Sequence, residues 1–220
     1  FYSLLACNDY LQGRYQRARD RALELRESAL EVRNELQLGW SNYHLAQIAL
    51  ALGDHETALE HGLQAAEQLE RRGDLAELVA LGVVARVHAR RGDRQAASAV
   101  LEDLEGKLPG ASVNSYTRLE GHAGAAEAWL ELGDKARAEA ALPHLAAFSK
   151  RFRCGRPRLT LLQGLIRDSP AQLERARAQA ADYGLRLDEA RALAALGRTD
   201  EARASFARLR CRWNEEQLDA

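Results

Sequence analysis

The sequence predicts an all-α protein, an α-solenoid of stacked antiparallel helix pairs, and three observations predict it. An alanine is followed seven residues later by a glycine and five residues after that by a second alanine, five times in 220 residues. The first four of these glycines lie 40, 39 and 41 residues apart, a period typical of stacked helix pairs. Apolar residues recur at helical spacing between the glycines. The copies are Ala6/Gly13/Ala18, Ala46/Gly53/Ala58, Ala85/Gly92/Ala97, Ala126/Gly133/Ala138 and Ala190/Gly197/Ala202.

Each copy predicts a helix, a tight turn and a second helix. In the second copy an apolar stripe stops at Gly53-Asp54. Glycine just past a helix end is the usual left-handed cap, and an aspartate after it can accept the first amide hydrogens of the next helix. The apolar stripe of the first helix is Leu45, Ala46, Ala49 and Leu52, and that of the second is Ala58, Leu59, Leu63, Ala66 and Leu69.

The recurring alanines are predicted to be packing residues. Seven residues are about two helical turns, so the first alanine and the glycine share one face of the first helix. The second alanine lies one turn into the next helix, on the face that folds back against the first. Leucine at Ala46 or Ala58 is expected to overpack the pair by roughly 1–3 kcal/mol.

The period breaks after Gly133, because 64 residues separate it from Gly197. We expect an irregular pair here: a short helix over 161–166, a turn at 168–170 and a second helix over 171–183 that Gly184 ends. Residues 149–158 are expected to form a connecting loop. The predicted units are residues 1–38, 39–77, 78–117, 118–148, the irregular 149–184, and 185–220, in one superhelical domain.

The repeats resemble the tetratricopeptide repeat (TPR) family, which has a small residue at the eighth position of each unit and an alanine at the twentieth. Gly53-Asp54 matches the family's turn, and Pro109 stands where the family often ends its second helix. The units are longer than the family's usual repeat, and Asn42 and Leu81 replace its bulky fourth-position aromatic. The resemblance implies a right-handed superhelix. The longer repeats are similar to those in C-terminal sensor regions of bacterial LuxR-type (STAND) transcription regulators and of multidomain cyclases or kinases.

Composition excludes several classes of partner. The formal net charge is −1, so the chain has no overall positive charge that would attract nucleic acid or an anionic membrane. No run of eighteen apolar residues occurs. The three cysteines lack C-x-x-C spacing and predict free thiols in a reducing, cytoplasmic setting. The chain holds no methionine and begins with Phe1, which indicates a segment of a longer protein or a record from which methionines were lost.

No motif predicts catalysis, a metal or a cofactor. His55-Glu56 opens a zinc-protease-like pattern, but the next histidine, His61, lies six residues on rather than four and therefore on another helix face. Gly106-Lys107 is followed by a leucine and lacks the earlier glycine of a phosphate loop. No nucleophile, base and orienting group stand in evident relation. We expect a protein that is not an enzyme and binds no cofactor.

The TPR resemblance implies a concave groove lined by the first helix of each pair, which would pass from aromatic to basic to acidic residues and suit a peptide or a folded partner. Trp40, Tyr43 and Arg86 are the best anchors by residue type, and the alternative is that Trp40 and Tyr43 pack between repeats. The candidate groove residues are Trp40, Tyr43, His44, Gln47, Arg86, Arg90, Glu120, Glu127 and Glu131.

A basic segment follows the fourth unit, with Phe152 inside it. Such a segment can hold a phosphate or an acidic partner through charge-assisted hydrogen bonds and stacking, and the alternative is a solvated surface run. Its cationic residues are Lys150, Arg151, Arg153, Arg156 and Arg158.

The expected function is that of a noncatalytic sensor or interaction domain in a larger bacterial signalling or transcription regulator. Its groove would hold a peptide, a protein, another domain of the same chain or a small inducer, and bending of the stack would relay occupancy. Two alternatives stay open, a free-standing scaffold or oligomerisation module and a noncatalytic subunit that positions an enzyme. Residues 208–213 are expected either to cap the array or to stack on a further domain.

Overall fold

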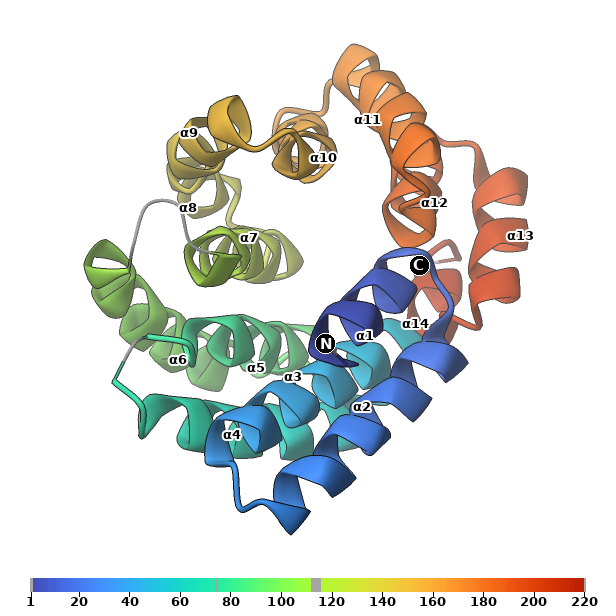
Figure 1. Ribbon diagram of the computed structural model, residues 1–220. Helices are drawn as coiled ribbons and strands as arrows, with labels where there is room; N and C mark the ends of the chain where they lie inside the picture. Colours follow the sequence, from blue (N-terminus) through green and yellow to red (C-terminus); the bar gives the residue numbers. More distant parts are fainter. Residues whose placement is uncertain (1, 74, 112–115, 220) are drawn as a thin grey trace.

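The computed structural model describes residues 2–73, 75–111 and 116–219, and its regular secondary structure there is helical throughout. Successive helices pack as antiparallel pairs that follow one another around a ring (Figure 1). The all-α prediction and the prediction of sequential antiparallel pairs are therefore confirmed.

One helix of each pair faces the centre of the ring and its partner lies outside (Figure 1). The inner helices are α1 (Tyr2–Leu11), α3 (Glu35–Leu52), α5 (Leu78–Arg90), α7 (Tyr116–Glu131), α10 (Arg156–Ile166) and α12 (Arg186–Ala195). The outer helices are α2 (Tyr15–Glu31), α4 (His55–Glu70), α6 (Arg94–Lys107), α8 (Lys135–Ala140) with α9 (Leu142–Arg151), α11 (Pro170–Tyr183) and α13 (Thr199–Leu209). Short 3₁₀ turns η1 (Leu108–Gly110) and η2 (Arg153–Gly155) follow α6 and α9, and α14 (Arg212–Glu216) comes last.

The repeated glycines end the inner helices as predicted. All five have positive φ angles, from 71° to 86°, which an L-residue with a side chain adopts only under strain. In three units the aspartate that follows caps the outer helix. The carboxylates of Asp54, Asp93 and Asp134 each accept a hydrogen bond from the backbone N–H three residues later, at 3.0–3.1 Å.

The repeated alanines form the contact between the two helices of each pair. All ten are completely buried, with 0% exposure. Small side chains at these positions let inner and outer helices approach closely, while leucines on either side fill the core. The pattern that repeats in the sequence is therefore the packing of the scaffold, as predicted.

The irregular region differs from the prediction at one point. The turn at 168–170 and the helix that Gly184 ends are present, with Gly184 at φ 70°. The prediction of a connecting loop over 149–158 was wrong, because α9 continues to Arg151, a 3₁₀ turn follows, and α10 already begins at Arg156. Pro157 lies in the first turn of α10, where its missing N–H is not needed, so it starts a helix rather than interrupting one.

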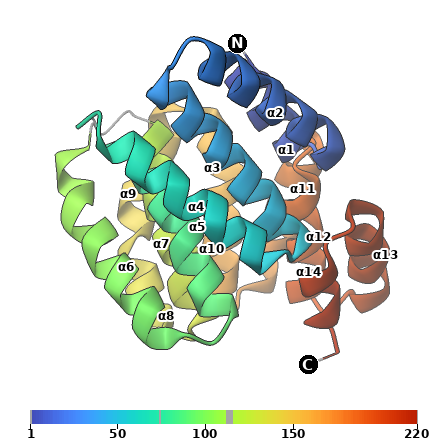
Figure 2. The ribbon, with the colours of Figure 1, turned by 90° about the horizontal axis from the view of Figure 1, so that it is seen from below.

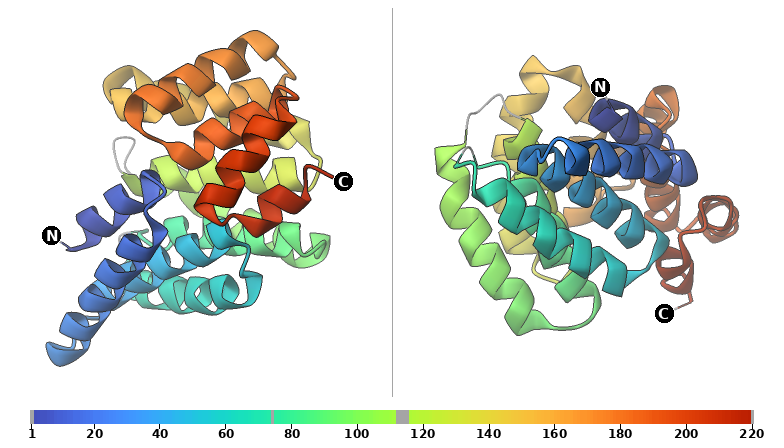
Figure 3. Two further views of the ribbon diagram at one scale, coloured as in Figure 1. Left: turned by 90° about the vertical axis from the view of Figure 1, so that its right-hand side faces the viewer. Right: turned by 60° about the horizontal axis from the view of Figure 1, so that its bottom comes forward.

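The last unit packs back onto the first two, and this closes the ring. One apolar cluster joins Tyr15 of α2 and Ile48 of α3 to Phe206 of α13 and the buried Cys211. Figures 2 and 3 show α14 beside α3 and the C-terminal helices beside the N-terminal ones. We call this contact between the last unit and the first two the seam.

Trp213 of α14 is central to the seam. Its backbone and Cβ lie where a side chain on Gly53 would be, and the Arg90 guanidinium carbon lies 3.9 Å from its ring centroid. Cys211 and Trp213 thus pack within the array, whereas Arg208, Arg210 and Arg212 are exposed. This arrangement favours the predicted capping role of residues 208–213.

We expect Trp213→Ala to lower the free energy of unfolding by about 2 kcal/mol, because a partly buried indole loses its apolar contacts and its cation–π partner. Urea unfolding followed by circular dichroism measures this. Arg212→Ala, on the same helix but exposed, is the matched control. Equal stability of Trp213→Ala and the wild type would show that the seam does not support the fold.

Among the described residues, no helix combines the length and the apolar character that crossing a membrane requires.

Candidate ligand-binding site

The candidate groove residues lie on the inner helices and converge at the centre of the ring, but they do not line an open groove. Tyr43, His44, Gln47 and Glu127 are buried, with exposures of 0%, 2%, 8% and 0%. Trp40 and Tyr43 pack in the apolar core between the second and third units, with ring centroids 5.7 Å apart. The alternative of packing between repeats is therefore the one observed for these two aromatics.

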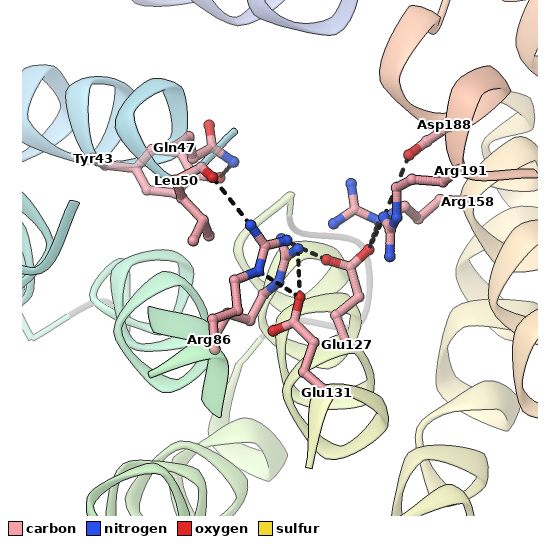
Figure 4. A network of polar contacts seen from close by, with 10 residues as sticks. Tyr43, Gln47, Leu50, Arg86, Glu127, Glu131, Arg158, Asp188 and Arg191 are labelled. Carbon is pink, nitrogen blue, oxygen red and sulfur yellow. Dashed lines mark hydrogen bonds and ion pairs between the residues drawn. The ribbon is translucent and has the colours of Figure 1, made fainter. Parts of the chain in front are cut away.

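Four of the charged candidates, Arg86, Arg90, Glu127 and Glu131, belong to one network centred on Glu127 of α7 (Figure 4). Three guanidinium groups from three other inner helices surround this carboxylate. The nearest nitrogen–oxygen distances are 2.6 Å to Arg86 of α5, 3.0 Å to Arg158 of α10 and 2.8 Å to Arg191 of α12. Glu127 thus ties together units that are far apart in the sequence.

A second carboxylate extends the network toward α3. Glu131 lies one turn after Glu127 and pairs with Arg86 at 3.1 Å and with Arg90 at 2.8 Å. Arg90 also donates a hydrogen bond from Nη1 to the carbonyl oxygen of Leu50 at 3.1 Å. Because the same guanidinium group stacks on Trp213, Arg90 connects the central network to the seam.

The close approach of α5 and α7 brings Arg86 of α5 next to Glu127 and Glu131 of α7. The helices touch at Gly82 and Gly124, where a Cβ on Gly124 would lie 2.7 Å from the Gly82 Cα. Arg86 lies one turn after Gly82, and Glu127 and Glu131 follow Gly124 on α7. Any side chain at this crossing would push the helices apart and lengthen the ion pairs.

The pKa values of two carboxylates at the centre, Glu127 and Glu120, shift in opposite directions. Burial alone would raise the pKa of Glu127, but the charges of Arg158, Arg191 and Arg86 outweigh it and hold this pKa well below the usual 4.5. Burial raises the pKa of Glu120, one of the groove candidates, and the negative charge of Glu127 adds to the rise. The centre therefore holds one firmly ionised carboxylate and one that binds its proton more readily.

Little room is left at the centre in this conformation. Two cavities of about 20 Å³ each flank Arg86 and Arg158, enough for a single water molecule apiece. Within the part of the chain that the structure describes, Gln47 Oε1, Arg86 Nε and Glu131 Oε2 are buried without a hydrogen-bond partner. A ligand larger than water can enter only if some of these side chains move.

The basic segment divides between two places. Lys150, Arg151, Arg153 and Arg156 are exposed at the end of α9, in η2 and at the start of α10. Arg158 instead turns inward to Glu127 and is only 19% exposed. The structure therefore separates the surface cations from the one that belongs to the centre.

Arg191 and Asp188 of α12 belong to the centre and were not among the sequence candidates. A signal for Arg191 was present, because it directly follows Ala190, the first alanine of its copy. Gln47, Arg86 and Glu127 occupy the equivalent position in three other copies, and each lines the centre. In these copies the residue after the first alanine therefore points toward the centre of the ring.

His44 makes folding sensitive to mild acid. It is buried, its Nε2 lies 2.8 Å from the Ser3 hydroxyl, and burial lowers its pKa from 6.5 to about 4. The unfolded chain therefore binds a proton more readily than the folded protein, so stability is full above pH 6.5 and falls as the pH drops toward 4.

Between pH 6.5 and 5, we expect His44 to lower the free energy of unfolding by on the order of 2 kcal/mol. Urea unfolding at several pH values measures it, with His44→Gln as the comparison. A pH slope that is unchanged in His44→Gln would contradict the assignment, because the substitution removes the titrating group.

The described residues contain no group of three or more His, Cys, Asp or Glu side chains placed to hold a metal ion. Comparison of the chain with protein-family models, with curated proteins and with solved structures found no match.

Proposed function

We propose that this chain is a noncatalytic binding domain, a TPR-like right-handed superhelix that senses a protein segment or a small polar ligand at its centre. In keeping with the resemblance of its repeats, it would serve a larger bacterial signalling or transcription regulator. The single observation that carries the proposal is the network around Glu127, which gathers arginines from three inner helices.

Packing within each helix pair does not need the network. Alanines and leucines already pack each helix pair, and buried ion pairs contribute less to stability than apolar packing of the same volume. Charged side chains from several units at one point are instead well suited to recognition, since a charged partner can exchange for one of the internal pairs. This is the physical argument for a binding role.

Binding would couple to the shape of the ring through Arg90. This residue pairs with Glu131 at the centre and stacks on Trp213 at the seam. A partner that captures Glu131 or Arg90 would weaken the stacking on Trp213 and shift the population from the closed ring toward an open one. Attached domains would sense the change in curvature.

Selection of short peptides from a displayed random library on the immobilised protein tests the proposal. We expect the selected peptides to bind at the centre and to lose about 10-fold or more in affinity for Arg191→Gln. Arg177→Gln is the matched control, because Arg177 lies on the outer helix α11 and, among the residues that the structure describes, forms an ion pair with Glu174 alone.

Hydrogen exchange of the wild-type protein with bound peptide gives a second readout that needs no variant. Changes in protection should fall on α5, α7, α10 and α12. Peptides that leave these helices unchanged, or that bind Arg191→Gln and Arg177→Gln equally, would contradict a central binding site.

A further inference from the structure

A separate pocket of about 270 Å³ lies between α6, α7, α8 and α9, away from the central network. Its walls are apolar over much of their area, with Leu108, Ala125 and Trp129 among them. Ala140 and Ala141, at the break between α8 and α9, also line it, so small residues leave the space open. This volume fits a small ligand rather than a peptide.

Two histidines form one wall of the pocket. The rings of His122 and His144 are stacked, with centroids 4.3 Å apart and an interplanar angle of 5°. His122 is 8% exposed, and its Nε2 has no hydrogen-bond partner among the described residues. A buried imidazole nitrogen without a partner is unusual, and a ligand in the pocket would supply one.

The charges around the pocket favour an anion. Two guanidinium groups, those of Arg118 and Arg137, line it together with one carboxylate, that of Glu105. Glu105 already accepts a hydrogen bond from the indole nitrogen of Trp129 at 2.7 Å. The Arg137 guanidinium lies over the Trp129 ring at 4.4 Å, and no carboxylate of the described chain pairs with it. Arg137 thus has its hydrogen-bond donors available to an incoming anion.

We propose that this pocket binds a small organic anion, a carboxylate carried on a flat apolar ring, with Arg137 and His122 as the groups that recognise the charge. The ring of the ligand would lie among the apolar and aromatic side chains, as flat ligands do in pockets of this kind. The proposal does not depend on the central network, so each can fail without the other.

Benzoate is the probe, with benzamide as its uncharged counterpart of similar shape. Isothermal titration at pH 7 should show saturable binding of benzoate and binding of benzamide that is weaker by about 10-fold or more. Arg137→Gln should weaken the binding of benzoate by a similar factor. This substitution is at an exposed position, so the fold should survive it. Arg177→Gln on α11 should leave binding unchanged.

The titration of His122 gives an independent readout. Burial, together with the charges of His144 of α9 and Arg118 of α7, lowers the pKa of His122 from 6.5 to about 4. Glu105 of α6 and Arg137 of α8 also line the pocket. An anion bound beside the imidazole favours its charged form, so benzoate should raise the pKa of His122 in an NMR titration, and benzamide should not.

Three results would overturn the proposal: no saturable binding of benzoate, equal binding of benzoate and benzamide, or equal affinities in Arg137→Gln and Arg177→Gln. Binding that leaves the His122 titration unchanged would place benzoate elsewhere on the protein and would overturn it as well.

Discussion

Glu127→Gln should lower the free energy of unfolding by about 3–5 kcal/mol, the largest effect that we expect from a single charge-neutralising substitution in this chain. Glutamine nearly preserves the shape of the side chain but removes the charge. The guanidinium groups of Arg86, Arg158 and Arg191 then face one another at the centre without the carboxylate that they share. Urea unfolding at neutral pH measures the loss.

Glu174→Gln is the control for this prediction. Glu174 pairs with Arg177 and Arg198 but is exposed on the outer helix α11, so its loss should change stability little. A Glu127→Gln protein as stable as Glu174→Gln would show that the central network does not hold the units together. Below the usual pKa of glutamate, the wild type should also lose this stabilisation as Glu127 is protonated, because its pKa is depressed in the folded state.

Gly124→Ala should destabilise the protein by about 1–3 kcal/mol, although alanine is normally the better helix former. The new methyl group would meet the backbone of Gly82 at 2.7 Å, and backbone cannot move aside as a flexible side chain does. The helices α5 and α7 must separate, which also lengthens the contacts between Arg86 and Glu127. Thermal and urea unfolding measure the effect.

Gly106→Ala on α6 is the matched substitution, because nothing lies within 4 Å of a Cβ at that position. It should be neutral or stabilise the protein by about 0.5–1 kcal/mol, as replacement of a helical glycine by alanine usually does. Similar effects of the two substitutions would contradict the close helix crossing.

The repeated pattern predicted the scaffold well because its residues act within one unit. Gly53 ends a helix through its own φ angle, Asp54 caps the next helix three residues away, and Ala46 and Ala58 meet across a single turn. Such contacts depend on residues near one another in the chain, so their spacing is visible in the sequence. The residue after the first alanine also points toward the centre because of its position within a single unit.

Closure of the ring was not predictable in the same way. It depends on a small rotation from each unit to the next, which adds up over the whole array. The same glycines and alanines are compatible with an open stack or a closed one. Only the accumulated curvature brings Trp213 onto Gly53 and Arg90.

The central network was predicted only in part. Arg86, Arg90, Glu127 and Glu131 were recognised as inward-facing, and the structure places them together. Their mutual pairing across units was not visible, because it depends on how far α5 and α7 approach. Arg158 was assigned to the connecting loop over 149–158, whereas it lies in the first turn of α10, next to Pro157.

The distance across the seam, with and without a bound peptide, tests the central claim most directly. Spin labels can be attached through cysteines introduced at Glu24 of α2 and Ala207 of α13, both exposed, after replacement of Cys7 and Cys154. The buried Cys211 of the seam is kept. Pulsed electron resonance then gives the distribution of distances between the labels. If the centre of the ring is a binding site coupled to closure, a saturating peptide selected as above should lengthen the mean distance, and Trp213→Ala should lengthen it without peptide. An unchanged distance with peptide bound at the centre would contradict the coupling between binding and opening.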